Sequence, residues 1–181
     1  MTSTPRPLTL TELNTLPADE AATRCAGLFE HSPWIPEAAL AERPFESIAA
    51  FHAACMRIVR ASDEAARVGL ISAHPDLVGR LAREGRLGRE STAEQAAAGL
   101  DRLSDAEVEA FERFNAAYHE RFGFPFVICA RKHRKDAILA AFPTRLEHER
   151  EEEIATAIEQ IGEIGWLRMV DLIAEGEDDA D

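Results

Sequence analysis

The spacing of apolar residues constrains this chain more than any other feature. Along most of its length they recur every three or four residues, as on one face of a helix, and rarely at every second residue. The β-branched residues that favour strands are sparse. The pattern predicts an all-α fold. Since 181 residues suffice for one core, we expect a single-domain helical bundle over residues 1–181, with an ordered core over about 8–174 and an acidic tail over 175–181.

Prolines and capping residues predict where helices begin and end. Pro75 disfavours helical backbone in the residue before it, so a helix should stop at His74. Ser91 and Ser104 are each followed three residues later by glutamate, which is typical of a helix N-terminus. Pro143 predicts a kink or break in the helix that contains it. The expected helices cover residues 8–16, 19–30, 47–60, 62–74, 104–122 and 151–174, with others beginning near 91 and 135.

Residues 123–129 have a different pattern. The segment reads Gly-Phe-Pro-Phe-Val-Ile-Cys, which is extended in character, contains one proline and has no evident partner strand. It therefore predicts an extended buried connector between two helices.

The charge balance narrows the choice of partners. Asp and Glu number 33 against 20 Lys and Arg, which leaves a formal net charge of −13. Such a surface would repel a phosphate backbone, so we expect no nucleic-acid partner. One dense basic run, residues 131–135, is interpreted either as a solvated turn or as a patch for an anionic ligand.

The cysteines and the apolar runs indicate in which cellular compartment the protein is expected. Three widely spaced cysteines do not suggest a disulfide framework and suit a reducing environment. No apolar run approaches the roughly 18 residues of a membrane span, and the N-terminus lacks a signal-type apolar run. We therefore expect a cytoplasmic protein with no membrane association.

Several familiar cofactor and metal motifs are missing. The sequence has no glycine-rich phosphate loop, no Cys-x-x-Cys, no His-Glu-x-x-His and no pair of histidines at a metal-chelating spacing. The expectation is a site that uses no metal and no organic cofactor.

His74 is the first candidate for chemistry. It stands at an expected helix C-terminus, where the dipole favours the imidazolium form, and Pro75 restricts the backbone after it. A histidine fixed in this way suits acid–base catalysis. It could equally be a polar residue that caps the helix end.

Three polar residues near an expected helix N-terminus form the second candidate. Glu94 would ordinarily bond back to the backbone of Ser91 as a cap. With Gln95 beside it, the same group could instead hold a polar, negatively charged ligand at the positive end of the helix dipole.

Arg168 is the third candidate. On a helical wheel it falls about 20° from Ile161, inside an apolar stripe. A guanidinium that faces the core needs an anionic partner, because burying it alone would cost several kcal/mol. That partner is either an internal carboxylate or a bound ligand.

Four motifs occur in order and with consistent spacing, and the pattern to which they belong covers nearly the whole chain, from about Leu8 to Ile173. They are His74-Pro75-Asp76-Leu77; Ser91-x-x-Glu94-Gln95-x-x-x-Gly99-Leu100; Phe114-Asn115-x-x-Tyr118-x-x-x-Phe122-Gly123-Phe124-Pro125-Phe126-Val127-Ile128-Cys129; and Leu167-Arg168-Met169-x-Asp171-Leu172. Together they resemble the 2-oxo-4-hydroxy-4-carboxy-5-ureidoimidazoline (OHCU) decarboxylase family.

The resemblance implies an all-helical enzyme that converts OHCU to (S)-allantoin at the end of urate breakdown, without metal or cofactor, and a homodimer. By motif match His74 would be the catalytic histidine and Glu94 its acidic partner. The substrate-binding residues that the resemblance implies are Pro75, Ser91, Gln95, Arg168 and the segment Phe126, Val127 and Ile128.

Two departures and two alternatives accompany this resemblance. The basic run at residues 131–135 and the proline at 143 differ from the family pattern, which puts the chain path over 131–147 in question. One alternative is a non-catalytic helical binding module, although the joint presence of all matched side chains argues against it. The other is a decarboxylase or hydrolase of a related ureido or imidazolone acid.

Overall fold

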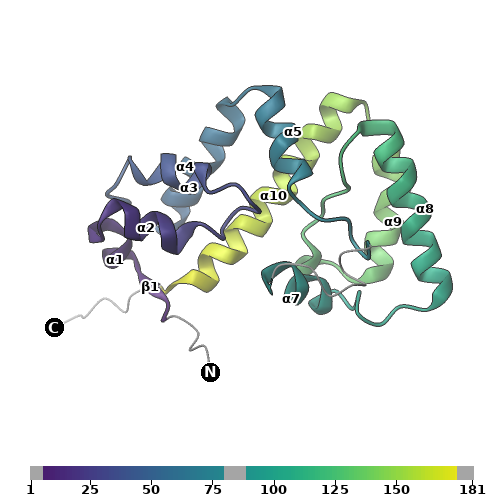
Figure 1. The fold of residues 1–181 in the computed structure, drawn as a ribbon, viewed down its shortest axis with the longest axis horizontal. Helices are drawn as coiled ribbons and strands as arrows, with labels where there is room; N and C mark the ends of the chain where they lie inside the picture. The colour runs from purple at the N-terminus through teal and green to yellow at the C-terminus, as the bar shows by residue number, and fades with distance from the viewer. Residues whose placement is uncertain (1–5, 80–88, 175–181) are drawn as a thin grey trace. The chain divides into compact units, whose positions relative to one another are not determined.

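The computed structural model describes residues 6–79 and 89–174, and it confirms the predicted all-α fold (Figure 1). The helices are α1 (Leu10–Thr15), α2 (Ala18–Cys25), α3 (Trp34–Leu40), α4 (Ile48–Ala61), α5 (Glu64–Ser72), α7 (Arg89–Ala97), α8 (Asp105–Phe122), α9 (Lys135–Leu146) and α10 (Arg150–Leu172), with the 3-10 turn η1 (Ala130–Lys132). None of the helices in these two ranges is long and apolar enough to cross a membrane.

The chain divides into two compact units. The first contains the chain up to Asp63 together with the part from Gly162 onward, and the second runs from Glu64 to Ile161. Helix α10 therefore contributes its first half to the second unit and its second half to the first. The single-domain organisation stays a prediction, and the two units are described separately.

The first unit packs helices closely around the second half of α10. A Cβ added at Gly165 would lie 2.9 Å from the ring of Phe29, and one at Gly162 would lie 2.9 Å from the methyl group of Met56. Glycine at these two positions therefore lets the aromatic ring and the α4 side chain contact the helix backbone directly.

A short sheet, which the sequence did not predict, joins the ends of the first unit. Strands β1 (Leu8–Thr9) and β2 (Ile173–Ala174) pair in parallel, with Leu8 opposite Ile173. Two residues are too few to show the alternating pattern from which a strand is predicted.

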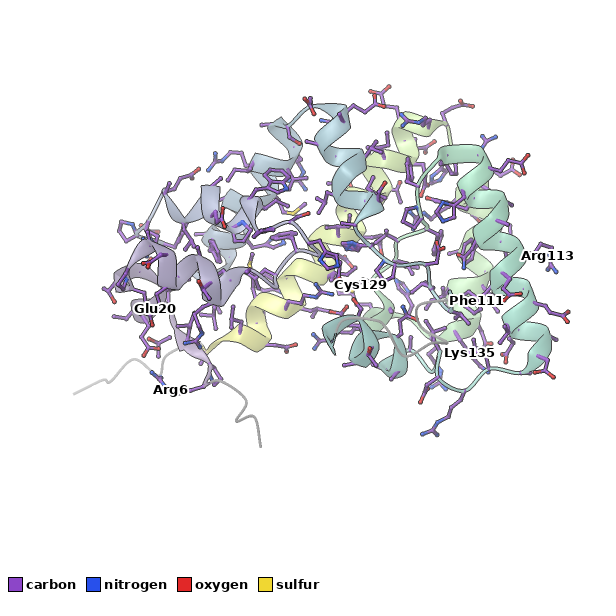
Figure 2. All side chains as sticks on the ribbon, in the orientation of Figure 1. Arg6, Glu20, Phe111, Arg113, Cys129 and Lys135 are labelled. Atoms are coloured by element: carbon purple, nitrogen blue, oxygen red, sulfur yellow. The ribbon has the colours of Figure 1, made fainter. Side chains whose placement is uncertain are left out.

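In the second unit, α8 has the ends that its sequence predicts. Ser104 and Glu107 form a capping box at its start, and Gly123 ends it with a left-handed φ of 80°. Helix α9 lies beside it (Figure 1). Phe111 points from α8 into the unit, while Arg113 points away from it (Figure 2).

The extended connector is confirmed, and it is buried from Phe124 to Cys129, whereas Gly123 is exposed. Its Phe126 ring stacks on Phe142 of α9 at a centroid distance of 3.9 Å and meets Tyr118 of α8 edge-on at 5.3 Å. The connector therefore lies within the aromatic core of the second unit.

Three expectations about helix boundaries were wrong. Helix α7 begins at Arg89, so Ser91 lies inside the helix and is not its cap. The break predicted at Pro143 is absent, since helix α9 continues through it to Leu146 although a proline cannot donate to the carbonyl four residues earlier; a kink there stays a prediction. Helix α2 ends at Cys25 and not near residue 30.

Candidate functional site

His74 lies two residues beyond α5, in a short irregular segment. Its backbone N–H donates to the carbonyl of Ile71 at 3.1 Å, which extends the last turn of the helix. The residue is only 8% exposed, whereas Pro75 after it is half-buried. The imidazole is therefore held at the end of a rigid element and is largely shielded from water.

The turn that follows His74 is fixed by side chains from α7 and α8. The Leu77 carbonyl accepts from Asn115 Nδ2 at 2.9 Å, and the Val78 N–H donates to Gln95 Oε1 at 3.3 Å. These two groups belong to one peptide bond, so an amide side chain holds each end of it. One residue earlier, Asp76 Oδ1 lies 2.8 Å from Nε2 of His119.

Helix α7 carries the second set of predicted residues on adjacent positions of one face. Ser91 and Gln95 are buried, at 5% and 7% exposure, and Glu94 is half-buried. Residues three or four apart lie side by side on a helix. Because Gln95 bonds to Val78, this face is joined to the turn after His74.

The backbone of the connector is held by α9 and α10. Arg145 Nη1 donates to the Val127 carbonyl at 2.6 Å, and the Cys129 N–H donates to Gln160 Oε1 at 3.0 Å. Phe126, Val127 and Ile128 are all buried. The Val127 carbonyl, one of the backbone groups assigned to substrate, thus already accepts a hydrogen bond within the protein.

A buried ionic network contacts the connector through Arg145. Arg145 Nε donates to Glu153 Oε1 at 2.8 Å, and the guanidinium lies 4.4 Å from the centroid of the Phe126 ring. Tyr118 donates its hydroxyl proton to Glu153, and His148 Nδ1 lies 2.7 Å from Oε2 of the same carboxylate. Burial raises the pKa of Tyr118 above its ordinary value, so the phenol stays protonated.

Arg168 has the internal partner that its burial requires. Its Nη2 donates to Glu30 Oε2 at 3.1 Å and its Nη1 to the Gly27 carbonyl at 3.2 Å, with the arginine 7% exposed. These contacts lie within the first unit, whereas His74 and the α7 residues belong to the second. That Arg168 and His74 meet at one substrate stays a prediction.

Within residues 6–79 and 89–174, no three His, Cys, Asp or Glu side chains are grouped so that they could hold a metal ion. The three cysteines are buried as free thiols. That the reaction needs no metal and no cofactor stays a prediction.

The predicted site did not include Asn115 and His119. Asn115 occurs in the third quoted motif, but on a helix an asparagine and a histidine four residues apart look like two polar side chains that face solvent. Their partners lie 38 and 43 residues earlier in the chain, so local spacing carries no sign of the contact.

Comparisons with known proteins identify the family to which this chain belongs. The family model described as OHCU decarboxylase matches residues 14–170. A 2-oxo-4-hydroxy-4-carboxy-5-ureidoimidazoline decarboxylase of Haloferax volcanii is 38% identical over 164 residues, which are 91% of this chain and 95% of the relative.

Two further proteins extend the comparison. A uric acid degradation bifunctional protein of Bacillus subtilis is 36% identical over 92% of this chain, which spans 33% of that longer protein. A crystal structure of (S)-allantoin synthase superposes with a TM-score of 0.75 at 32% identity, over 92% of this chain and 54% of that one. By its family match and its near full-length similarity to such relatives, this chain belongs to the OHCU decarboxylase family.

Proposed function

We propose that this protein decarboxylates OHCU to (S)-allantoin, as the names of its relatives imply. One structural observation carries the proposal: His74 is buried at a helix end, and the turn after it is bonded to Gln95 of α7, the helix that also carries Ser91 and Glu94. An acid–base group beside buried polar side chains is what this reaction needs.

The reaction requires that a proton be delivered to one face of the OHCU ring. The bond between carbon 4 and the carboxylate breaks, carbon dioxide leaves, and the electron pair forms a double bond between carbon 4 and carbon 5, which bears the ureido group. The electrons of the double bond from carbon 5 to the ring nitrogen move onto that nitrogen, which takes a proton. Carbon 5 then takes a second proton while the hydroxyl of carbon 4 releases its own and becomes the ring carbonyl. Hydrogen-bond donors around the developing negative charge lower the barrier.

We assign the proton transfer to His74, with Glu94 as its acidic partner. The imidazolium donates to carbon 5, and water restores the proton, so the net reaction consumes one proton. A histidine fixed at a helix end delivers that proton from one direction, which gives a single enantiomer.

We assign substrate binding to the remaining predicted residues. Arg168 would donate to an anionic or carbonyl oxygen of the substrate in addition to its bonds to Glu30 and Gly27. The others are Pro75, Ser91, Gln95 and the backbone of Phe126, Val127 and Ile128. We further propose that the enzyme uses no metal or cofactor and acts in the cytoplasm as a homodimer.

Kinetics with freshly generated OHCU test the proposal. The protein should accelerate the loss of OHCU well above the spontaneous rate, and His74→Ala should return it to that rate with the fold intact. The control is His133→Ala, which removes a half-buried histidine of the basic run and should leave the rate unchanged. A wild type without activity would overturn the proposal, and an active His74→Ala would remove His74 from it.

A further inference from the structure

We propose that Asn115 and His119 are positioning residues: by holding the Leu77 carbonyl and the Asp76 carboxylate, they fix the turn after His74 and so set the direction from which the His74 imidazole meets the substrate. The inference rests on the proposed function, because fixing this turn affects catalysis only if His74 transfers the proton. It adds two residues to the machinery that do not themselves touch the substrate.

Both side chains come from one face of α8. Asn115 and His119 are four residues apart, so their side chains lie about one helical turn apart on the same face. Asn115 Nδ2 donates to the Leu77 carbonyl at 2.9 Å, and His119 Nε2 lies 2.8 Å from the carboxylate of Asp76. Helix α8 therefore holds two successive residues of the turn that begins at His74.

The turn would not keep its shape without such contacts. Val78 has a φ of 56°, a left-handed conformation that a β-branched residue rarely adopts. A Cβ added at Gly79 would lie 2.8 Å from Cβ of Asp76, so the chain is also tightly folded back on itself. A strained backbone of this kind persists only where several contacts hold it in place. Here Asn115, His119 and Gln95 supply those contacts.

The asparagine amide has only one productive orientation. The Leu77 carbonyl is an acceptor, so it must face the NH₂ group. Asn115 is 7% exposed, and within the described ranges its Oδ1 is buried and has no hydrogen-bond partner. The side chain therefore acts here as a donor to the turn, and no other hydrogen bond of the described structure explains an amide at this position.

Truncating the two side chains tests the inference. Asn115→Ala and His119→Ala should each lower kcat about tenfold or more, because a small misplacement of a catalytic group is costly, while KM stays within about twofold. The allantoin formed should lose enantiomeric excess. His119→Gln keeps an N–H donor near the position of Nε2 and should recover most of both losses, which a general loss of stability would not allow.

Asn14→Ala is the matched control. Asn14 also holds a loop through amide bonds, from Nδ2 to the Phe45 carbonyl at 2.9 Å and from the Phe45 N–H to Oδ1 at 2.8 Å, but it lies in the other unit. It should lower Tm and leave kcat and enantiomeric excess unchanged. If Asn115→Ala fails to fold, the exposed His119 still gives the decisive variants.

The outcomes separate this inference from the proposed function. An active wild type whose His119→Ala and folded Asn115→Ala variants keep full kcat and enantiomeric excess would overturn the inference alone. A wild type without activity on OHCU would overturn the proposed function and this inference with it. Loss of kcat and enantiomeric excess in His119→Ala, recovered in His119→Gln, would support the inference.

Discussion

At the scale of single residues, burial decides which partners a charged side chain must have. Arg168 falls in an apolar helical stripe, so the sequence predicts an anionic partner but leaves open whether it is a carboxylate or a ligand. The structure supplies Glu30, which lies 138 residues before Arg168 in the chain. Local periodicity reveals the need for a partner and not its identity.

The Arg168–Glu30 pair predicts two separable effects of Arg168→Ala. Removing the guanidinium breaks the ion pair with the half-buried Glu30 carboxylate and should cost about 3 kcal/mol of unfolding free energy. If Arg168 also binds substrate, KM should rise. Urea unfolding and kinetics of Arg168→Ala and of Arg168→Ala/Glu30→Gln check both. The double variant should regain stability while KM stays high; a normal KM in it would confine Arg168 to the internal pair.

Glu107 gives a residue-level prediction for pH. Hydrogen bonds lower the pKa of the Glu107 carboxyl from 4.5 to about 2; the bond from Lys135 has the largest effect, and the bonds from Ser104 come next. Because the folded pKa is the lower one, the stabilisation is complete above about pH 4.5 and disappears as pH falls towards 2. The difference in urea midpoint between wild type and Glu107→Gln should therefore shrink from pH 6 to pH 3. An equal difference at both pH values would contradict this.

At the scale of elements, the sequence predicts ends better than contacts. Both ends of α8 follow from its capping box and Gly123, and the connector follows from its extended apolar pattern. The start of α7 does not, because Ser91 and Glu94 fit a cap and a helix interior equally well. The turn after His74 depends on α8 through contacts far apart in the chain, which no local pattern encodes.

The network between α8, α9 and α10 yields a prediction at this scale. Glu153 is fully buried and accepts from both Arg145 and Tyr118. Glu153→Gln should cost about 3–5 kcal/mol of unfolding free energy, because it leaves the Arg145 guanidinium buried without its counter-charge. Glu153→Gln/Arg145→Met should recover part of that loss. Urea unfolding of the wild type and the two variants measures it, and a loss below about 1 kcal/mol in the single variant would show that the network contributes little.

At the scale of the whole molecule, the predicted site draws on both compact units. His74, the α7 residues and the connector belong to one, and Arg168 belongs to the other. The sequence motifs give their order along the chain but not the distance between residues that are some 90 positions apart. What the motifs do specify is the family, because four of them occur together and the similarity covers nearly the whole chain.

The handedness of the product tests the central claim most directly, because only a proton delivered from a fixed direction gives one enantiomer. Fresh OHCU should be incubated with the protein after exhaustive chelation, and the allantoin analysed by circular dichroism or chiral chromatography. We predict (S)-allantoin in clear excess at a rate well above that without protein. Racemic allantoin formed at the spontaneous rate would contradict the account.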